Sequence, residues 1–325
     1  MGQGAFIFGC EGVTLSPREA AFFREAQPWG FILFARNVET PEQLRSLTDA
    51  LREAVGRDAP VLIDQEGGRV QRMRAPHWRE FLPPLDQVQQ AYDPDRALWI
   101  RGRLLAEDLH SVGIDVNCAP GLDVAREQTH PFLKNRCFSE DHGMVARMGR
   151  ALVEGMAAGG VAPVMKHLPG HGRGTVDSHK GLPHVYATRA ELSEDFAPFE
   201  ALSDLSMGMS AHIILDAIDP HRPATQSPKV IDLIRDEIGF DGLLMTDDIS
   251  MGALDGTVLE RAQAALAAGC DMVLHCNGDL AEMEQLAHLG AMSETAQSRA
   301  DHAAHTRPSY QPIDITALAD EFSRT

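Results

Sequence analysis

Residues 161–179 read VAPVMKHLPGHGRGTVDSH, in which a short apolar run, Val161–Met165, leads directly into a segment rich in histidine and glycine. The run has the length and composition of a strand that is buried on both faces. Glycines and a proline then interrupt the pattern, which predicts a shaped loop rather than a continued strand. Loops that follow strands often hold catalytic side chains, because a rigid sheet positions them. We therefore interpret residues 166–179 as an active-site loop.

Similar short apolar runs recur along the whole chain, and patterns typical of helices separate them. The predicted strands are Ala5–Gly9, Gly30–Phe34, Val61–Asp64, Ile114–Asn117, Ala162–Lys166, Met207–His212, Leu243–Asp247 and Met272–His275. Helix starts are marked by a capping side chain followed by proline, as at Ser16-Pro17 and Thr40-Pro41. Eight alternations predict an α/β protein with a single (β/α)8 barrel of the TIM type. An open doubly wound sheet is the alternative, but no GxGxxG motif follows the first run.

The domain boundary is predicted from a change in composition near the end of the chain. We expect residues 1–289 to form the barrel. Residues 290–325 are polar and only weakly periodic, and they are expected to form a C-terminal helix and a tail packed on the barrel.

The composition restricts the classes of function. A net charge of −18 over 325 residues argues against a nucleic-acid-binding protein and against adhesion to anionic membranes. No apolar run approaches the length of a membrane span, and the N-terminus lacks the pattern of an export signal. The five cysteines are odd in number and form no CxxC pair, so we expect a reducing, cytoplasmic location. We expect the protein to be a monomer or weak dimer. An anionic substrate would need local cations, and Arg173 and Lys134 are candidates.

Polar residues follow several of the predicted strands, where a barrel places its active site. These residues are Asp64, Lys166, His167, His212, Asp247 and Asp248. Carboxylates and a lysine from distant parts of the chain are typical of a carbohydrate-processing site. A single aspartate after a strand more often caps the next turn, so of the adjacent Asp247 and Asp248 we expect one to be functional and one structural. His212 is equally compatible with a satisfied core histidine and with a ligand.

The pair Gly67-Gly68 precedes two arginines, Arg69 and Arg72. The glycines suggest that the backbone here passes close to something bound, whereas surface charges are the simpler interpretation of the arginines.

The histidine-rich loop has three possible interpretations. It is a structural loop, or a metal site built from His167, His171, Asp177 and His179, or a source of acid/base catalysis. The four residues do not have the helical spacing of an HExxH metal site. Asp177 and His179 are two residues apart, so an extended backbone turns both side chains to the same side. A carboxylate beside an imidazole stabilises its protonated form, which makes this pair a candidate acid/base dyad.

Three motifs together resemble glycoside hydrolase family 3: KHLPGHGRGTVDSH followed by Gly181-Leu182-Pro183, IDQEGGRVQR, and MTDDISM. Within that family the chain is similar to the β-N-acetylhexosaminidases of bacterial cell-wall recycling, from about Ile7 to Gly278. The resemblance implies one (β/α)8 barrel and a retaining mechanism through a covalent glycosyl-enzyme. Some members carry a second domain that supplies a glutamate acid/base. Since little sequence follows residue 289, we expect the single-barrel branch.

The resemblance also implies residue roles. Asp247 matches the nucleophile, and His179, assisted by Asp177, matches the acid/base. The residues that match those holding the N-acetylglucosamine unit are Asp64, Arg72, Arg136, Lys166 and His167. The implied substrate is N-acetylglucosaminyl-β-1,4-anhydro-N-acetylmuramic acid, with or without peptide, and neither a cofactor nor a metal is implied. Leu168 stands where phenylalanine is more usual, and residues 126–134 differ from the usual loop.

Three other functions remain open from the sequence. A metal-dependent hydrolase would use the histidines of the loop. A β-glucosidase-type exo-glycosidase would share the family but not the sugar. A non-catalytic barrel would bind sugar without turnover.

Overall fold

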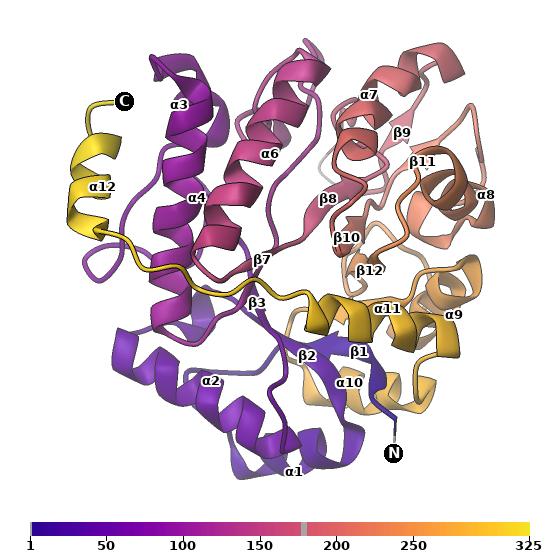
Figure 1. The fold of residues 1–325 in the computed structure, drawn as a ribbon. Helices are drawn as coiled ribbons and strands as arrows, with labels where there is room; N and C mark the ends of the chain where they lie inside the picture. Colours follow the sequence, from indigo (N-terminus) through magenta and orange to yellow (C-terminus); the bar gives the residue numbers. More distant parts are fainter. Residues whose placement is uncertain (1, 177–180) are drawn as a thin grey trace.

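The computed structural model describes residues 2–176 and 181–325. Within these ranges, one parallel sheet has the strand order β7-β6-β3-β2-β1-β13-β12-β10-β8. Its two terminal members, β7 (Ala162–Pro163) and β8 (Met165–Leu168), are separated in the chain by Val164 alone. Both ends of the sheet are therefore the same stretch of polypeptide, and the sheet closes into a barrel (Figure 1).

The other strands coincide with the predicted apolar runs. They are β1 (Gly4–Phe8), β2 (Pro28–Leu33), β3 (Val61–Ile63), β6 (Val116–Asn117), β10 (Met207–Ser210), β12 (Leu243–Asp248) and β13 (Met272–His275). The predicted (β/α)8 barrel is confirmed, with strand ends that differ from the prediction by at most two residues. Short additional strands occur in the loops: β4 (Gln65–Gly67), β5 (Val70–Gln71), β9 (His184–Val185) and β11 (Ile214–Leu215).

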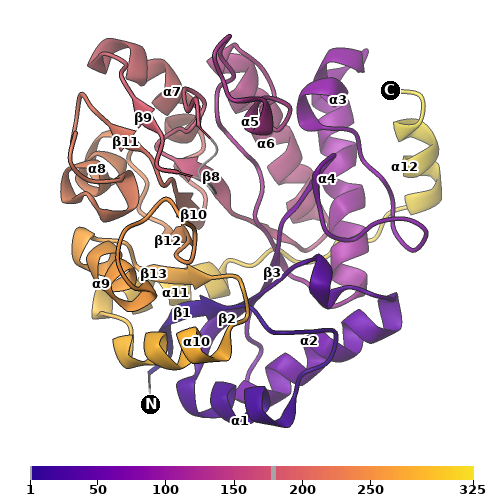
Figure 2. The ribbon, with the colours of Figure 1, turned by 180° about the vertical axis from the view of Figure 1, so that it is seen from behind.

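Helices surround the barrel on its outside (Figures 1 and 2). The described α-helices that connect its strands are α1 (Pro17–Ala26), α2 (Pro41–Val55), α3 (Pro84–Gln90), α4 (Pro94–Ser111), α5 (Pro131–Lys134), α6 (His142–Ala158), α7 (Arg189–Ala201), α8 (Pro228–Asp232) and α9 (Val258–Ala268), and α10 (Leu280–Leu286) follows the last strand, β13. The predicted caps are confirmed: Ser16 and Thr40 each accept a hydrogen bond from a backbone N–H of the first turn. No helix in the described ranges combines the length and apolar composition of a membrane span.

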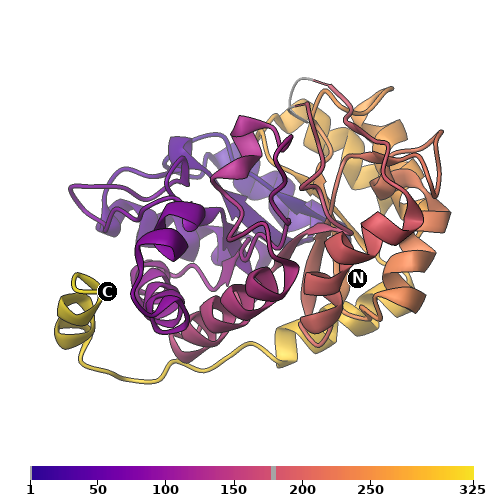
Figure 3. The ribbon, with the colours of Figure 1, turned by 90° about the horizontal axis from the view of Figure 1, so that it is seen from above.

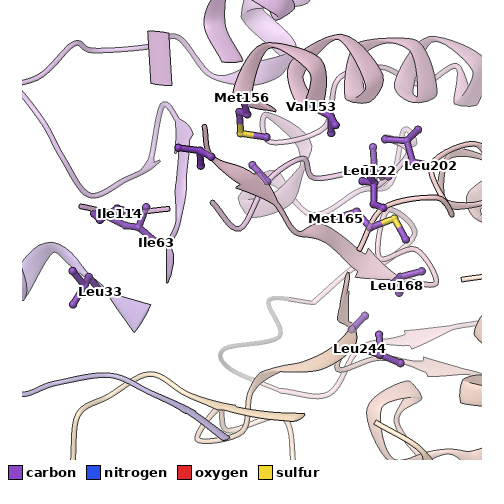
Figure 4. Close-up of a cluster of buried hydrophobic side chains, with 14 of the residues drawn as sticks. Leu33, Ile63, Ile114, Leu122, Val153, Met156, Met165, Leu168, Leu202 and Leu244 are labelled. Atoms are coloured by element: carbon purple, nitrogen blue, oxygen red, sulfur yellow. The ribbon is translucent and has the colours of Figure 1, made fainter. Parts of the chain in front are cut away.

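Side-chain alternation along the strands produces two large hydrophobic clusters in the described residues. Ile7, Ile32 and Leu62 point into the barrel, whereas their neighbours Phe6, Phe31 and Val61 pack outward against the helices. Figure 4 shows part of the outer layer, to which Val153 and Met156 of α6 and strand residues such as Met165 all belong. The barrel interior is thus a packed core, and any site must lie at one of its two ends.

Residues 290–325 contain two helices rather than the one helix and tail that the sequence predicts. Ala300 and Ala303 of α11 (Glu294–His305) join the inner cluster, so α11 covers the end of the barrel where the strands begin. A segment then runs along the outside of the molecule to α12 (Ile315–Phe322), which packs beside α4 (Figure 3). Asp314 caps α12 and Leu318 is buried, which explains why this short stretch is helical. The domain division at residue 289 stays a prediction.

Candidate active site

A pocket of about 280 Å³ lies at the carboxyl ends of the strands. Six of the predicted site residues line it: Asp64, Arg72, Arg136, Lys166, His167 and Asp247. Asp64 directly follows β3, Lys166 and His167 belong to β8, and Asp247 belongs to β12. The two other predicted residues, Asp177 and His179, lie outside the described residues. The roles of all eight in binding and catalysis stay predictions.

The floor of the pocket contains a network of ion pairs centred on Lys166, which is only 2% exposed. Lys166 Nζ lies 2.7 Å from Asp64 Oδ1, and Arg72 Nη2 donates to Asp64 Oδ2 at 3.0 Å. Burial alone would raise the pKa of Asp64, but Lys166 and Arg72 hold it below its ordinary value. Both oxygens of Asp64 therefore stay anionic and oriented, which suits the binding of sugar hydroxyls.

Glu66 completes this network and was not singled out by the sequence analysis. Arg136 donates to both oxygens of Glu66, at 2.9 and 2.8 Å, and Lys166 Nζ lies 2.6 Å from Glu66 Oε1. Burial would raise the pKa of Glu66, yet Arg136 and Lys166 lower it to about 2. The signal in the sequence was its position two residues after Asp64, which turns both side chains to the same side of an extended chain.

Asp123 is a second carboxylate that the sequence analysis did not identify. Its Oδ2 lies 2.6 Å from His167 Nδ1, and its Oδ1 accepts the backbone N–H of His171 at 2.7 Å. Burial would raise the pKa of Asp123, but His167 and His171 lower it to about 2. The anion orients the His167 ring and fixes the start of the histidine-rich segment. The one sequence signal for Asp123 was its position in the loop after the fourth barrel strand, β6.

The adjacent Asp247 and Asp248 have different surroundings. Asp248 accepts hydrogen bonds from the backbone N–H groups of Ser250 and Cys276, each at 3.1 Å, and from the Ser250 hydroxyl at 2.7 Å. Asp247 Oδ1 accepts the N–H of Asp248 at 2.7 Å, whereas no described residue donates a hydrogen bond to its Oδ2. This arrangement is consistent with one structural and one functional acid.

The charge state of Asp247 depends on its neighbours. Burial would raise its pKa, but His212, His167 and the N–H of Asp248 hold the pKa below its ordinary value. The carboxylate is therefore ionised at neutral pH, as a nucleophile must be.

His212 is a satisfied buried histidine that supports this segment. Its Nδ1 lies 2.8 Å from the Thr225 hydroxyl, and its Nε2 lies 3.1 Å from the backbone carbonyl of Asp248. It is 1% exposed, and burial lowers its pKa. Of the two interpretations left open by the sequence, the core histidine agrees with these contacts.

The glycine pair was expected to pass close to something bound. Gly67 has φ +109°, and a Cβ there would lie 2.1 Å from Arg101 Nη2, so its close neighbour is a buried arginine rather than a ligand.

Arg173 and Lys134 were expected to supply local positive charge for an anionic substrate. Arg173 is bound to Asp195, and Lys134 lies 3.3 Å from Glu140. Neither cation lines the pocket. The cations that do so are Arg69, Arg72, Arg136 and Lys166.

The metal interpretation required four ligands, of which the structure describes His167 and His171. No three His, Cys, Asp or Glu side chains within residues 2–176 and 181–325 form a group that could hold a metal ion. His167 Nδ1 is already engaged by Asp123.

Comparison with known protein families agrees with the motifs at this pocket. Residues 14–306 match the model of the glycosyl hydrolase family 3 N-terminal domain. The chain belongs to this family. As a glycosyl hydrolase family 3 protein it carries its polar side chains where the barrel fold places active sites.

Similar proteins within the family indicate which type of glycoside hydrolase this is. A β-hexosaminidase from Alkalilimnicola ehrlichii is 40% identical over 297 residues, which cover 88% of this chain and 84% of that protein. A β-hexosaminidase from Pseudomonas aeruginosa is 35% identical over 326 residues, covering 98% and 97%. NagZ from Neisseria gonorrhoeae, solved in complex with N-trifluoroacetyl-D-glucosamine, superposes with a TM-score of 0.89 at 28% identity, covering 100% of this chain and 98% of that one. This family member is therefore a glycoside hydrolase of the β-N-acetylhexosaminidase type.

Proposed function

We propose that the chain is a retaining exo-β-N-acetylglucosaminidase that removes terminal β-linked N-acetylglucosamine from cell-wall muropeptides. The proposed substrate is N-acetylglucosaminyl-β-1,4-anhydro-N-acetylmuramic acid, with or without peptide. The observation that carries the proposal is that the Asp247 carboxylate and the Asp64–Lys166 pair line one pocket. The N-trifluoroacetyl-D-glucosamine complex of the gonococcal NagZ supports the choice of sugar. All five cysteines are free and buried, which suits a reducing cytoplasm.

In the proposed mechanism Asp247 attacks the anomeric carbon while His179, protonated, gives its proton to the leaving oxygen. The glycosyl-enzyme bond forms as the glycosidic bond breaks. Neutral His179 then takes a proton from water while the water oxygen attacks the anomeric carbon; the bond to Asp247 breaks and the sugar leaves with retained configuration. Asp177 orients His179 and stabilises its protonated form. An imidazole suits this dual role because its ordinary pKa lies near neutrality.

The proposed sugar contacts follow from the ion network. Asp64, Arg72 and Lys166 present one acceptor group and two donors that are already fixed by mutual hydrogen bonds. Arg136 and His167 are fixed in the same way by Glu66 and Asp123. Preorganised groups of this kind lose little conformational entropy when a sugar binds. We therefore assign all five to recognition of the N-acetylglucosamine unit.

The first test compares the 4-nitrophenyl glycosides of N-acetylglucosamine and glucose. The proposal expects release of nitrophenol from the first with a higher kcat/KM than from the second. The reverse preference would favour the β-glucosidase alternative, and no release from either would favour a non-catalytic barrel. The anomer first formed, followed by proton NMR, should be β; an α product would exclude the covalent mechanism.

The metal-dependent alternative has its own test. The proposal expects full activity after dialysis against EDTA. Loss of activity that added Zn²⁺ restores would support a metal-dependent hydrolase instead.

A further inference from the structure

A buried carboxylate outside the pocket, Asp195 on α7, binds two arginines from different loops. Only 2% of Asp195 is exposed. Its Oδ1 accepts a hydrogen bond from Arg126 Nη2 at 2.7 Å, and its Oδ2 accepts one from Arg173 Nε. Arg126 belongs to the connection between β6 and α6, and Arg173 belongs to the segment after β8. One anion on a helix thus joins two loops of the barrel's carboxyl end.

The same two loops are joined directly as well. The Thr129 hydroxyl donates to the carbonyl of Gly172 at 2.5 Å, and the backbone N–H of His130 donates to the carbonyl of Gly174 at 3.1 Å. A Cβ on Gly172 would lie 1.9 Å from the carbonyl oxygen of Val124, so the two backbones are in close contact. Residues 126–130 therefore brace residues 170–174, with Asp195 fastening both to α7.

The braced segment connects to the chemistry of the pocket. His171 lines the pocket, and its backbone N–H donates to Asp123, the carboxylate that holds His167. The segment continues in sequence to Asp177 and His179, the proposed acid/base pair, which lie outside the described residues. A shift of residues 170–174 would move the start of this chain segment relative to the pocket.

We infer that Asp195 is a positioning residue for glycoside hydrolysis: through Arg126 and Arg173 it fixes residues 170–174, from which the chain continues in sequence to the proposed acid/base. The inference rests on the proposed function, because it needs an acid/base in that segment. Glu194 of the same helix also lies near both guanidinium groups, with its Oε2 3.0 Å from Arg126 Nη2 and 4.0 Å from Arg173 Nη2, but it is half exposed. Without the charge of the buried Asp195, one exposed carboxylate remains for two cations, so the contacts that hold the two loops on α7 weaken.

The test replaces Asp195 with asparagine, which keeps the shape of the side chain and removes its charge. We measure kcat and KM of the full chain on 4-nitrophenyl N-acetylglucosaminide, a good leaving group, and on the phenyl analogue, a poor one. Poor leaving groups need protonation, so a misplaced acid slows them selectively. We expect Asp195→Asn to lose kcat/KM, which reports the step in which the leaving group departs, about tenfold more on the phenyl than on the nitrophenyl substrate, because small misplacements of catalytic groups cost about 10²-fold.

A matched control exists at the opposite end of the barrel. Asp271 is 5% exposed and also lies between two arginines, with Arg235 Nη2 at 2.7 Å and Arg299 Nη1 at 3.0 Å. It precedes β13, at the end covered by α11. Asp271→Asn should destabilise the fold without changing the ratio of the two kcat/KM values. This control separates positioning from a general loss of stability.

Variants of the two arginines and of His179 distinguish a failure to fold from a failure of the inference. If Asp195→Asn does not fold, Arg126→Gln and Arg173→Gln each keep one partner on Asp195, and both should show the same bias at smaller amplitude. Equal loss on both substrates, or no loss, in folded variants would overturn the inference. His179→Ala is assayed in parallel: if it shows the bias and the Asp195 variants do not, only the positioning role fails. If His179→Ala shows none, the proposed acid/base itself is wrong.

Discussion

Asp123 Oδ2 lies 2.6 Å from Nδ1 of His167, and this contact links the loop after β6 to strand β8, between residues 44 positions apart in the sequence. Because Asp123 also accepts the backbone N–H of His171, a single anion orients one ring of the pocket and fixes the chain that follows it. The geometry of the proposed sugar-binding residues thus depends on a residue that does not itself line the pocket.

Asp123→Asn should therefore weaken substrate binding. An amide in place of the carboxylate weakens the contact with His167 Nδ1, so the orientation of the ring is less well fixed. We expect KM for 4-nitrophenyl N-acetylglucosaminide to rise about tenfold, which corresponds to about 1.4 kcal/mol, with a smaller change in kcat. Steady-state kinetics on the folded variant measures this. An unchanged KM would show that the Asp123 contact does not support sugar binding.

Asp247→Ala should abolish turnover, because the proposed covalent intermediate cannot form without the carboxylate. Removal of one member of a catalytic unit costs ~10⁴-fold or more in kcat. Asp248→Asn is the matched control: its contacts to Ser250 and Cys276 predict a loss of stability with most of kcat retained. The assay is nitrophenol release together with thermal unfolding. An active Asp247→Ala protein would move the nucleophile elsewhere, with Asp248 as the first candidate.

His179→Ala should show a leaving-group dependence. General acid catalysis contributes about 10²–10⁴-fold, but an activated aryl leaving group departs without protonation. We therefore expect a large loss of kcat/KM on a disaccharide substrate and a much smaller one on the 4-nitrophenyl glycoside. Equal losses on both substrates would contradict the acid role.

Protein stability should fall with acidification because of His171. Burial lowers the pKa of His171 to about 4, an effect that exceeds the opposing attraction of Asp123. Between the unfolded-state pKa near 6.5 and the folded pKa, the unfolded chain binds more protons, so stability is greatest above pH 6.5 and declines toward pH 4. The free energy of unfolding should decrease by about 2 kcal/mol between pH 7 and pH 5 from this residue alone.

Urea unfolding of the wild type and of His171→Gln at the two pH values measures the effect. The substitution should reduce the pH dependence by that amount. If both proteins show the same slope, His171 is not buried as a neutral imidazole.

The sequence predicted the barrel well because its strands are short, apolar and separated by clear helix caps. Asp64, Lys166 and Asp247 were identifiable since each stands at a strand end, where the fold itself defines the site. Glu66 and Asp123 were not identified, because their role depends on partners, Arg136 and His167, that are distant in the chain. An isolated carboxylate in a loop has no pattern of its own.

The remaining differences between the prediction and the structure depend on side-chain packing that the sequence does not reveal. Gly67-Gly68 indicated close approach correctly, but sequence could not distinguish a ligand from the Arg101 side chain that occupies the space. The second C-terminal helix, α12, was missed because a short polar stretch gains its helicity from a cap and from packing beside α4.

Negative and positive side chains alternate along Asp64, Lys166, Glu66 and Arg136. This alternation limits how the affinity for the proposed sugar can be divided among the individual side chains. Each member neutralises a neighbour, so a substitution at any one position leaves at least one neighbouring charge with one ion pair fewer. The loss of affinity measured for an alanine variant would therefore contain two terms. One is the lost contact with the sugar in the proposed function, and the other is the free-energy cost of the ion pair that its neighbour has lost. Thermodynamic cycles that remove oppositely charged neighbours together are needed to isolate what each group contributes to the ligand.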